Sequence, residues 1–145
     1  MKSSPFLLTM LLATCFLFIN CKKQDRSYVV EINLLTQDTL VYDEQILWWN
    51  SPNQTISYKR DSIFNSNDLK GDWFKYERDG SFEAALSNGH TYSGNWELLE
   101  NATKIRLSSI ELSYDETFEI IALTKEKFEW TDLEHHSFYR QVSKK

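Results

Sequence analysis

Three histidines have the most obvious capacity for chemistry, and two of them are neighbours. Glu134, His135 and His136 form a dense polar group, and His90 lies earlier in the chain. Neighbouring residues of a strand point to opposite faces, so His135 and His136 can share one metal ion only within a loop. Zinc sites usually need three or four converging ligands. We therefore expect a solvated loop here, with no metal site and no cofactor.

The sequence contains no recognised motif for nucleophilic or acid–base catalysis. It contains no Gly-x-Ser-x-Gly elbow, no phosphate-binding glycine loop and no His-Glu-x-x-His motif. The acidic pairs Asp43-Glu44 and Asp115-Glu116 are adjacent along the chain. A glycosidase instead holds two carboxylates on facing elements, about 5 to 9.5 Å apart. We interpret both pairs as turns or solvated faces, and we expect the protein not to be an enzyme.

Aromatic residues at strand spacing are the remaining candidates for a site. The chain has 5 Trp, 7 Tyr and 9 Phe, and most of them follow residue 20. We single out Trp73, Tyr92, Trp96 and Trp130 as candidate lining of an internal ligand pocket. The alternative is that these four side chains form an ordinary hydrophobic core.

Apolar and polar residues alternate with a period of two along most of the chain. No segment shows a sustained helical apolar stripe. Strands are expected at residues 28–35, 40–49, 54–60, 73–78, 81–86, 90–99, 103–107, 117–123, 128–133 and 138–142, with residues 110–114 as an extension or a further strand. The prediction is an all-β fold, a single antiparallel up-and-down meander of about eight to ten strands. Closure into a barrel or a curled sheet would remove its exposed edges.

Turn signals separate the strands. Asp79-Gly80 and Asn88-Gly89 are dipeptides that favour type I′ hairpin turns, and they frame a three-stranded meander. Asn50-Ser51-Pro52-Asn53 is a turn cluster, and turns are also expected at Asp115-Glu116 and over residues 124–126.

A series of short motifs follows along the second half of the chain. Residues 76–82 read aromatic-x-x-Asp-Gly-x-Phe, and residues 94–98 read Gly-x-Trp-x-Leu. Ile105-Arg106-Leu107 comes next, then Ile-x-x-Leu-Thr at residues 120–124 and the aromatic segment Phe128-Glu129-Trp130. Together these motifs resemble the lipocalin-like domain common among small lipoproteins of Bacteroidota. The resemblance implies a lipocalin-like barrel and covers about half of the mature domain, but it assigns no binding residue.

The front of the domain departs from that pattern. The family usually opens with Gly-x-Trp well before its Asp-Gly hairpin, whereas Gly71-Asp72-Trp73 immediately precedes Asp79-Gly80. Trp48-Trp49 is a candidate for the opening role. An eight-stranded barrel is just wide enough to be filled by its own side chains or to hold one small ligand.

The first twenty residues look like an export signal. Lys2 precedes an apolar run over residues 6–19, which is shorter than the ~20 residues of a membrane-spanning helix. The segment Leu17-Phe18-Ile19-Asn20-Cys21 resembles a lipobox, the motif in which the chain is cut before a cysteine that carries lipid. The alternative is an uncleaved membrane helix. The expected organisation is a lipoprotein signal peptide over residues 1–20, lipidated Cys21 with a short tether to residue 27, and a β domain over residues 28–142.

Charge and cysteine content restrict the partners. Residues 27–145 carry 12 Lys and Arg against 20 Asp and Glu, which is unfavourable for binding nucleic acid. The only other cysteine, Cys15, lies in the signal, so the mature domain would have no disulfide. Lys22 after the cysteine, in place of an inner-membrane retention aspartate, implies the outer membrane of the cell envelope, on either face.

The sequence thus favours a membrane-anchored protein that binds a small apolar ligand or an envelope component. The alternative is a structural or inhibitory interaction protein with a filled core. In that case the function would lie in surface loops such as residues 50–53 and 65–70.

Overall fold

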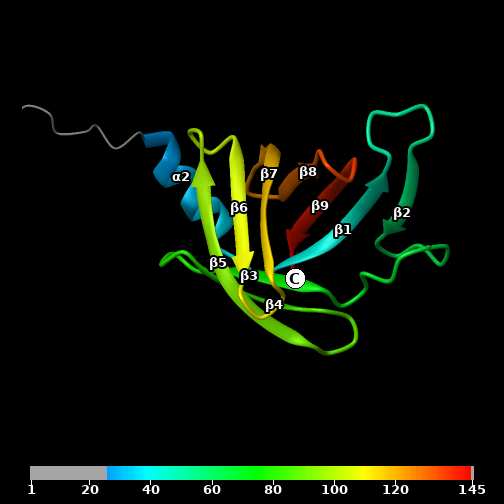
Figure 1. The fold of residues 1–145 in the computed structure, drawn as a ribbon, viewed down its shortest axis with the longest axis horizontal. Helices are drawn as coiled ribbons and strands as arrows, with labels where there is room; N and C mark the ends of the chain where they lie inside the picture. Colours follow the sequence, from blue (N-terminus) through cyan, green and yellow to red (C-terminus); the bar gives the residue numbers. More distant parts are fainter. Residues whose placement is uncertain (1–25, 145) are drawn as a thin grey trace, which may run out of the picture.

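The computed structural model describes residues 26–144, which form an antiparallel β-barrel with one helix (Figure 1). The predicted signal peptide, Cys21 and the first tether residues lie outside the described residues. In chain order the elements are α2 (Arg26–Leu35), β1 (Leu40–Leu47), β2 (Thr55–Lys59), β3 (Trp73–Tyr76), β4 (Ser81–Ala85), β5 (Thr91–Leu99), β6 (Lys104–Ser109), β7 (Tyr114–Leu123), β8 (Lys127–Asp132) and β9 (Ser137–Ser143).

The barrel closes between its first and last strands. β1 pairs with β9 from Leu40 opposite Ser143 to Leu47 opposite Ser137. From β3 onward each strand pairs with the next, so β1 and β3–β9 make eight closed strands and β2 is an additional strand. The other edge of β1 is divided, since its start pairs with β3 and its end with β2. The predicted all-β meander is confirmed, and closure removes the edges that an open sheet would expose.

Alternation places one set of side chains inside the barrel. On β3 and β4, for example, Phe74, Tyr76, Phe82 and Ala84 are buried, whereas the intervening Lys75 and Glu83 are exposed. The buried core cluster consists of Leu35, Leu40, Tyr42, Tyr58, Phe74, Tyr76, Phe82, Ala84, Trp96, Leu98, Ala102, Ile105, Leu107, Phe118, Phe128 and Trp130.

The β3–β4 and β4–β5 turns lie where the sequence predicted them, but they are not of type I′. Gly80 and Gly89 have φ of 88° and 84°, and the preceding Asp79 and Asn88 do not have positive φ. The amide of Gly80 donates to the Glu77 carbonyl (3.1 Å), as in a type I turn followed by a left-handed glycine. Asp79 Oδ1 accepts from the amide of Ser81 (2.9 Å) and favours this conformation.

Helix α2 occupies residues for which the sequence predicted a strand over 28–35, so that prediction is wrong. Ile32 and Leu35 are three positions apart and share a helix face; Leu35 is fully buried and Ile32 packs against the core. The apolar run is too short to distinguish a period of two from one of 3.6. The closed barrel also leaves this segment no edge of β1 to pair with.

The predicted turn at Asp115-Glu116 is also wrong, because both residues lie near the start of β7. The chain reverses earlier, where the amide of Ser113 donates to the Ile110 carbonyl (3.1 Å). Arg106 on β6 forms an ion pair with Asp115 (2.6 Å), which suits a cross-strand position better than a turn.

The tryptophan pair at residues 48 and 49 does not open the barrel. Both residues follow β1; Trp48 has φ of 56° and is 56% exposed. Trp49 stacks on Phe138, with ring centroids 4.5 Å apart. The pair therefore belongs to the β1–β2 connection.

The two ends of the barrel differ. We call one the helix end: Leu35 and Ile32 of α2 pack there, and Gln37 Nε2 donates to the Lys125 carbonyl in the β7–β8 turn (3.3 Å). Because the strands are antiparallel, the connections over residues 86–90, 110–113 and 133–136 lie at the opposite end, which we call the open end. The helix therefore closes one end only.

Candidate ligand-binding cavity

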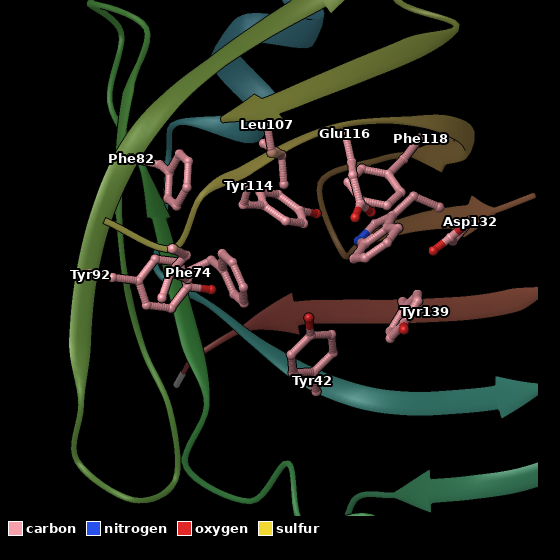
Figure 2. A pocket seen from close by; sticks show the side chains of 12 residues that line it. Tyr42, Phe74, Phe82, Tyr92, Leu107, Tyr114, Glu116, Phe118, Asp132 and Tyr139 are labelled. Carbon is pink, nitrogen blue, oxygen red and sulfur yellow. The ribbon is translucent and has the colours of Figure 1, made fainter. Parts of the chain in front are cut away.

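A cavity of about 230 Å³ lies inside the barrel toward the open end (Figure 2). Its wall is mainly aromatic, and strands from all around the barrel contribute to it. The lining residues are Tyr42, Phe74, Phe82, Tyr92, Leu107, Leu112, Tyr114, Glu116, Phe118, Trp130, Asp132 and Tyr139. Leu112 at the mouth is 43% exposed, whereas Phe82 and Phe118 deeper in the barrel are buried. An apolar cavity with a few polar groups is the usual form of a small-molecule site.

Four tyrosines give this apolar wall hydroxyl groups. Burial raises the pKa of Tyr42 well above its ordinary value and raises the pKa of Tyr92 to about 12. Burial, followed by the charge of Glu116, also raises the pKa of Tyr114. The hydroxyls of Tyr42, Tyr92 and Tyr114 are therefore neutral at physiological pH and can either donate or accept a hydrogen bond.

The polar side of the cavity lies between β7 and β8. Asp132 Oδ1 accepts from the amides of Glu134 (2.9 Å) and His135 (3.0 Å), and Asp132 Oδ2 lies 2.6 Å from His135 Nδ1. The Asp132 hydrogen bond raises the pKa of His135. Asp132 thus fixes the β8–β9 turn, and it also places a carboxylate in the cavity wall.

Glu116 supplies the second carboxylate. Its oxygen, an Asp132 oxygen and a His135 ring nitrogen lie within 4.8 Å of one another. Burial, and then the charge of Asp132, raise the pKa of Glu116. This grouping could hold a cation. Sequence reasoning missed it, because residues 116 and 132 become neighbours only through the pairing of β7 with β8.

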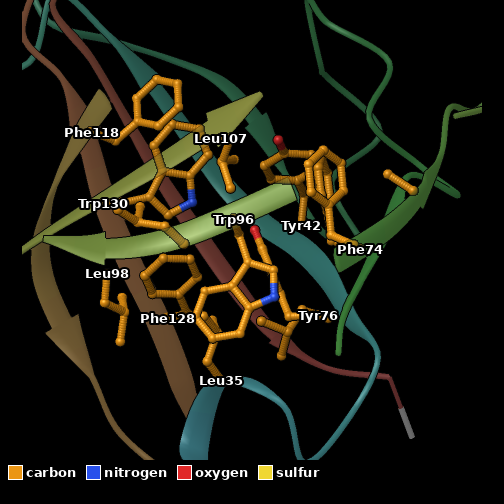
Figure 3. Packing of buried hydrophobic residues seen from close by; sticks show 14 of the residues in the cluster. Leu35, Tyr42, Phe74, Tyr76, Trp96, Leu98, Leu107, Phe118, Phe128 and Trp130 are labelled. Atoms are coloured by element: carbon orange, nitrogen blue, oxygen red, sulfur yellow. The ribbon is translucent and has the colours of Figure 1, made fainter. Parts of the chain in front are cut away.

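Two of the four predicted lining residues line the cavity, and the other two do not. Tyr92 and Trp130 line the cavity. Trp96 instead packs in the core, where its ring meets Tyr76 edge to face and its Nε1 donates to the Glu77 carbonyl (2.9 Å) (Figure 3). Trp73 is half-buried on the outer face, because on β3 it is Phe74 and Tyr76 that point inward.

Two other residues that line the cavity could have been predicted from the sequence. Tyr42 and Tyr139 both lie in predicted strands, and alternation could have placed them inside if the face had been known. The rings of Trp130 and Tyr139 stack with centroids 4.2 Å apart, because the two residues face each other across β8 and β9. Strand register, which the sequence did not supply, identifies this pair.

The histidines agree with the expectation of exposed positions. His90, His135 and His136 are all exposed, and the structure does not bring the three together. His135 instead contacts Asp132, as described above. Within residues 26–144, no helix has the length and apolar character needed to cross a membrane.

Comparison with known proteins places the fold in the lipocalin-like class. A lipocalin-like protein from Bacteroides uniformis superposes with a TM-score of 0.54 at 15% identity, covering 77% of this chain and 99% of that one. A DUF4847 family protein from Bacteroides vulgatus gives 0.53 at 10% identity, covering 77% and 95%. An uncharacterized protein from Bacteroides eggerthii gives 0.52 at 14% identity, covering 74% and 98%.

No protein-family model and no curated protein sequence matches this chain. The likeness to the solved structures confirms, for the fold, the lipocalin-like resemblance seen in the motifs over residues 71–130. At these identities the likeness extends to the fold alone.

Proposed function

We propose that the protein binds one small, mainly apolar molecule inside its barrel and presents it at the cell envelope. The observation that carries the proposal is the cavity of about 230 Å³ with an aromatic wall, which lies inside a barrel that α2 covers at one end and has Leu112 of the β6–β7 connection at its mouth. Eight-stranded barrels of this kind can hold a single small ligand. The proposal includes no catalytic residue.

The position of α2 supports a particular arrangement at the membrane. In the proposed lipoprotein, acylated Cys21 is separated from the start of α2 at Arg26 by four residues. Such a tether spans at most roughly 15–20 Å. The helix end would then face the bilayer, and the open end of the cavity would face the aqueous compartment. The outer membrane remains the expected location.

Native mass spectrometry tests the binding proposal. Protein purified from its native host under gentle conditions should carry an added mass that is lost on denaturation. Leu107→Trp, which enlarges a buried side chain in the cavity wall, should reduce the bound fraction. Ile121→Trp, at a 51% exposed position on β7, is the matched control and should retain it. Equal occupancy in both variants would place the ligand outside the cavity.

Acyl labelling in a bacterial host tests the anchor. Cys21→Ser should abolish incorporation of labelled fatty acid and leave the unprocessed precursor. Cys15→Ser, within the predicted signal, should change neither result. Labelling of the Cys21→Ser protein would exclude Cys21 as the attachment site.

A second candidate function, protein–protein interaction, is favoured by one loop. Ile63 and Phe64 in the β2–β3 connection are each 87% exposed. Asn65 holds the base of this loop, since its Oδ1 accepts from the Lys59 amide (2.9 Å) and its Nδ2 donates to the Lys59 carbonyl (3.2 Å). Crosslinking in the envelope tests this role: a product lost in Phe64→Ser, but retained in Leu107→Trp, would support it.

A further inference from the structure

The cavity wall is negatively charged. Its lining includes the carboxylates of Glu116 and Asp132 and, among the residues described as lining it, no lysine or arginine. The oxygens of Asp132 are engaged by the β8–β9 turn and by His135. Glu116 has no comparable hydrogen bond to the described residues. Glu116 therefore directs a carboxylate at the cavity with no cationic residue in the described lining; the exposed His135 ring, outside that lining, has a nitrogen within 4.8 Å of it.

Trp130 provides a second, independent observation. Its side chain lines the cavity and the residue is 6% exposed, yet its Nε1 is buried without a hydrogen-bond partner in the described structure. Figure 3 shows the Trp130 ring nitrogen on the side facing Leu107, inside the barrel. Native structures rarely leave a buried N–H unpaired, so this donor points to a ligand atom that accepts a hydrogen bond.

Aromatic rings flank the Glu116 carboxylate. Figure 2 shows Glu116 between the rings of Tyr114 and Phe118, with Tyr139 across the cavity. The Trp130 ring centroid is 4.5 Å from that of Phe118 and 4.2 Å from that of Tyr139. Ring faces attract ammonium groups, and the attraction is greatest where water is displaced. An anionic ligand would instead meet two carboxylates.

The cavity volume limits the size of the ligand. An apolar cavity of about 150 Å³ in another protein holds benzene. A cavity of about 230 Å³ therefore suits a compact body with a single ring and a short substituent. A long acyl chain would exceed this space.

We propose that the cavity selects a compact organic cation, with an ammonium group at Glu116, a ring against the aromatic wall of the cavity, and an oxygen acceptor for Trp130 Nε1. This inference rests on the proposed function and narrows its ligand class. Asp132 lies on the same side and adds to the negative potential, while its own turn holds it in place. No covalent step is involved.

Isothermal titration calorimetry of the full-length protein tests the charge preference with three probes of nearly equal shape. Tyramine carries an ammonium group, tyrosol a neutral hydroxyl and 4-hydroxyphenylacetate a carboxylate, and each has a phenol oxygen for Trp130. Tyramine should bind at least about tenfold more tightly than tyrosol, and the anion should bind most weakly.

Single-residue variants test which side chains produce the preference for a cationic ligand. Glu116→Gln should weaken tyramine binding by about tenfold and leave tyrosol binding within about twofold. Asp115→Asn is the matched control, because its side chain is on the same strand but pairs outside with Arg106, and it should change neither affinity. Trp130→Phe, which keeps a ring but removes the donor, should weaken tyramine and tyrosol alike.

The outcomes separate this inference from the proposed function. If tyrosol or the anion binds as tightly as tyramine, or Glu116→Gln leaves the tyramine preference intact, cation selection is overturned while the cavity remains a binding site. If none of the three binds but toluene does, cation selection is likewise overturned. If toluene also fails to bind, the proposed function fails with it.

Discussion

Gly94 on β5 lies directly opposite Phe82 on β4, and the Phe82 ring occupies the space that a side chain at position 94 would need. A Cβ at position 94 would come within 2.6 Å of the ring and would also overlap the Ser108 carbonyl oxygen. The glycine of the Gly-x-Trp-x-Leu motif is therefore required by a close approach rather than by a turn. The Phe82 ring in turn forms part of the cavity wall.

Gly94→Ala should consequently lower the free energy of unfolding by on the order of 3 kcal/mol, because ring and backbone must both shift. Gly89→Ala is the control; nothing lies within 4 Å of its added Cβ, and only its φ of +84° is unfavourable. That change should cost about 1 kcal/mol. Urea unfolding followed by circular dichroism measures both, and an equal cost would contradict the packing argument.

Leu35→Ala should destabilise the protein by about 2–4 kcal/mol, since Leu35 is fully buried where α2 closes the barrel. Leu133→Ala, at a 57% exposed position in the β8–β9 turn, should cost less than about 0.5 kcal/mol. Thermal and urea unfolding give the comparison. A small effect at Leu35 would show that the helix does not contribute to the core.

Arg140 on β9 bridges two acidic residues, one on each of the strands that flank β9, namely β1 and β8. Its Nε lies 2.7 Å from Glu129 Oε1, and its Nη1 lies 2.9 Å from Glu44 Oε2. The Glu129 side chain is only 7% exposed. Burial alone would raise the pKa of Glu129, but hydrogen bonds from Lys127 and Arg140 lower it below the ordinary value.

Arg140→Ala should therefore cost about 2–3 kcal/mol, because it leaves a buried carboxylate with only one cationic partner. Arg106→Ala removes the exposed ion pair with Asp115 and should cost less than about 1 kcal/mol. Unfolding in urea at neutral pH measures the difference. Equal losses of unfolding free energy in the two variants would contradict a contribution to stability from the buried position of Glu129.

The contact between His135 and Asp132 predicts a pH dependence of stability. The hydrogen bond to Asp132 raises the pKa of His135, so the folded state binds the proton more tightly than the unfolded state. The stabilisation is therefore complete below the unfolded pKa of about 6.5 and is lost as the pH rises through the higher folded value. His135→Gln should lower the melting temperature more at about pH 5.5 than at about pH 8.5.

His136→Gln is the control for this effect, because His136 is an exposed neighbour in the same turn. This variant keeps the hydrogen bond between His135 and Asp132, so it should leave the pH-dependent stabilisation in place. An NMR titration should also give His135 an apparent pKa above the ordinary histidine value. A value at or below the ordinary one would exclude the proposed contact in solution.

Local patterns in the sequence determined the strands and most of the turns. Alternation is a property of neighbouring residues, so it located β3 to β9 and favoured a closed barrel or a curled sheet. The Asp-Gly and Asn-Gly turns were located for the same reason. The motifs from Tyr76 to Trp130 indicated the lipocalin-like fold, which the comparisons support.

Tertiary structure decided what local patterns could not. The segment before β1 is apolar enough for a strand or a helix, and it is helical because β1 already pairs with β9 and Leu35 can fill the barrel end. The cavity depends on which residues face one another across strands. Glu116, Asp132 and Trp130 meet only through the β7–β8 register, and spacing along the chain carries no information about that register.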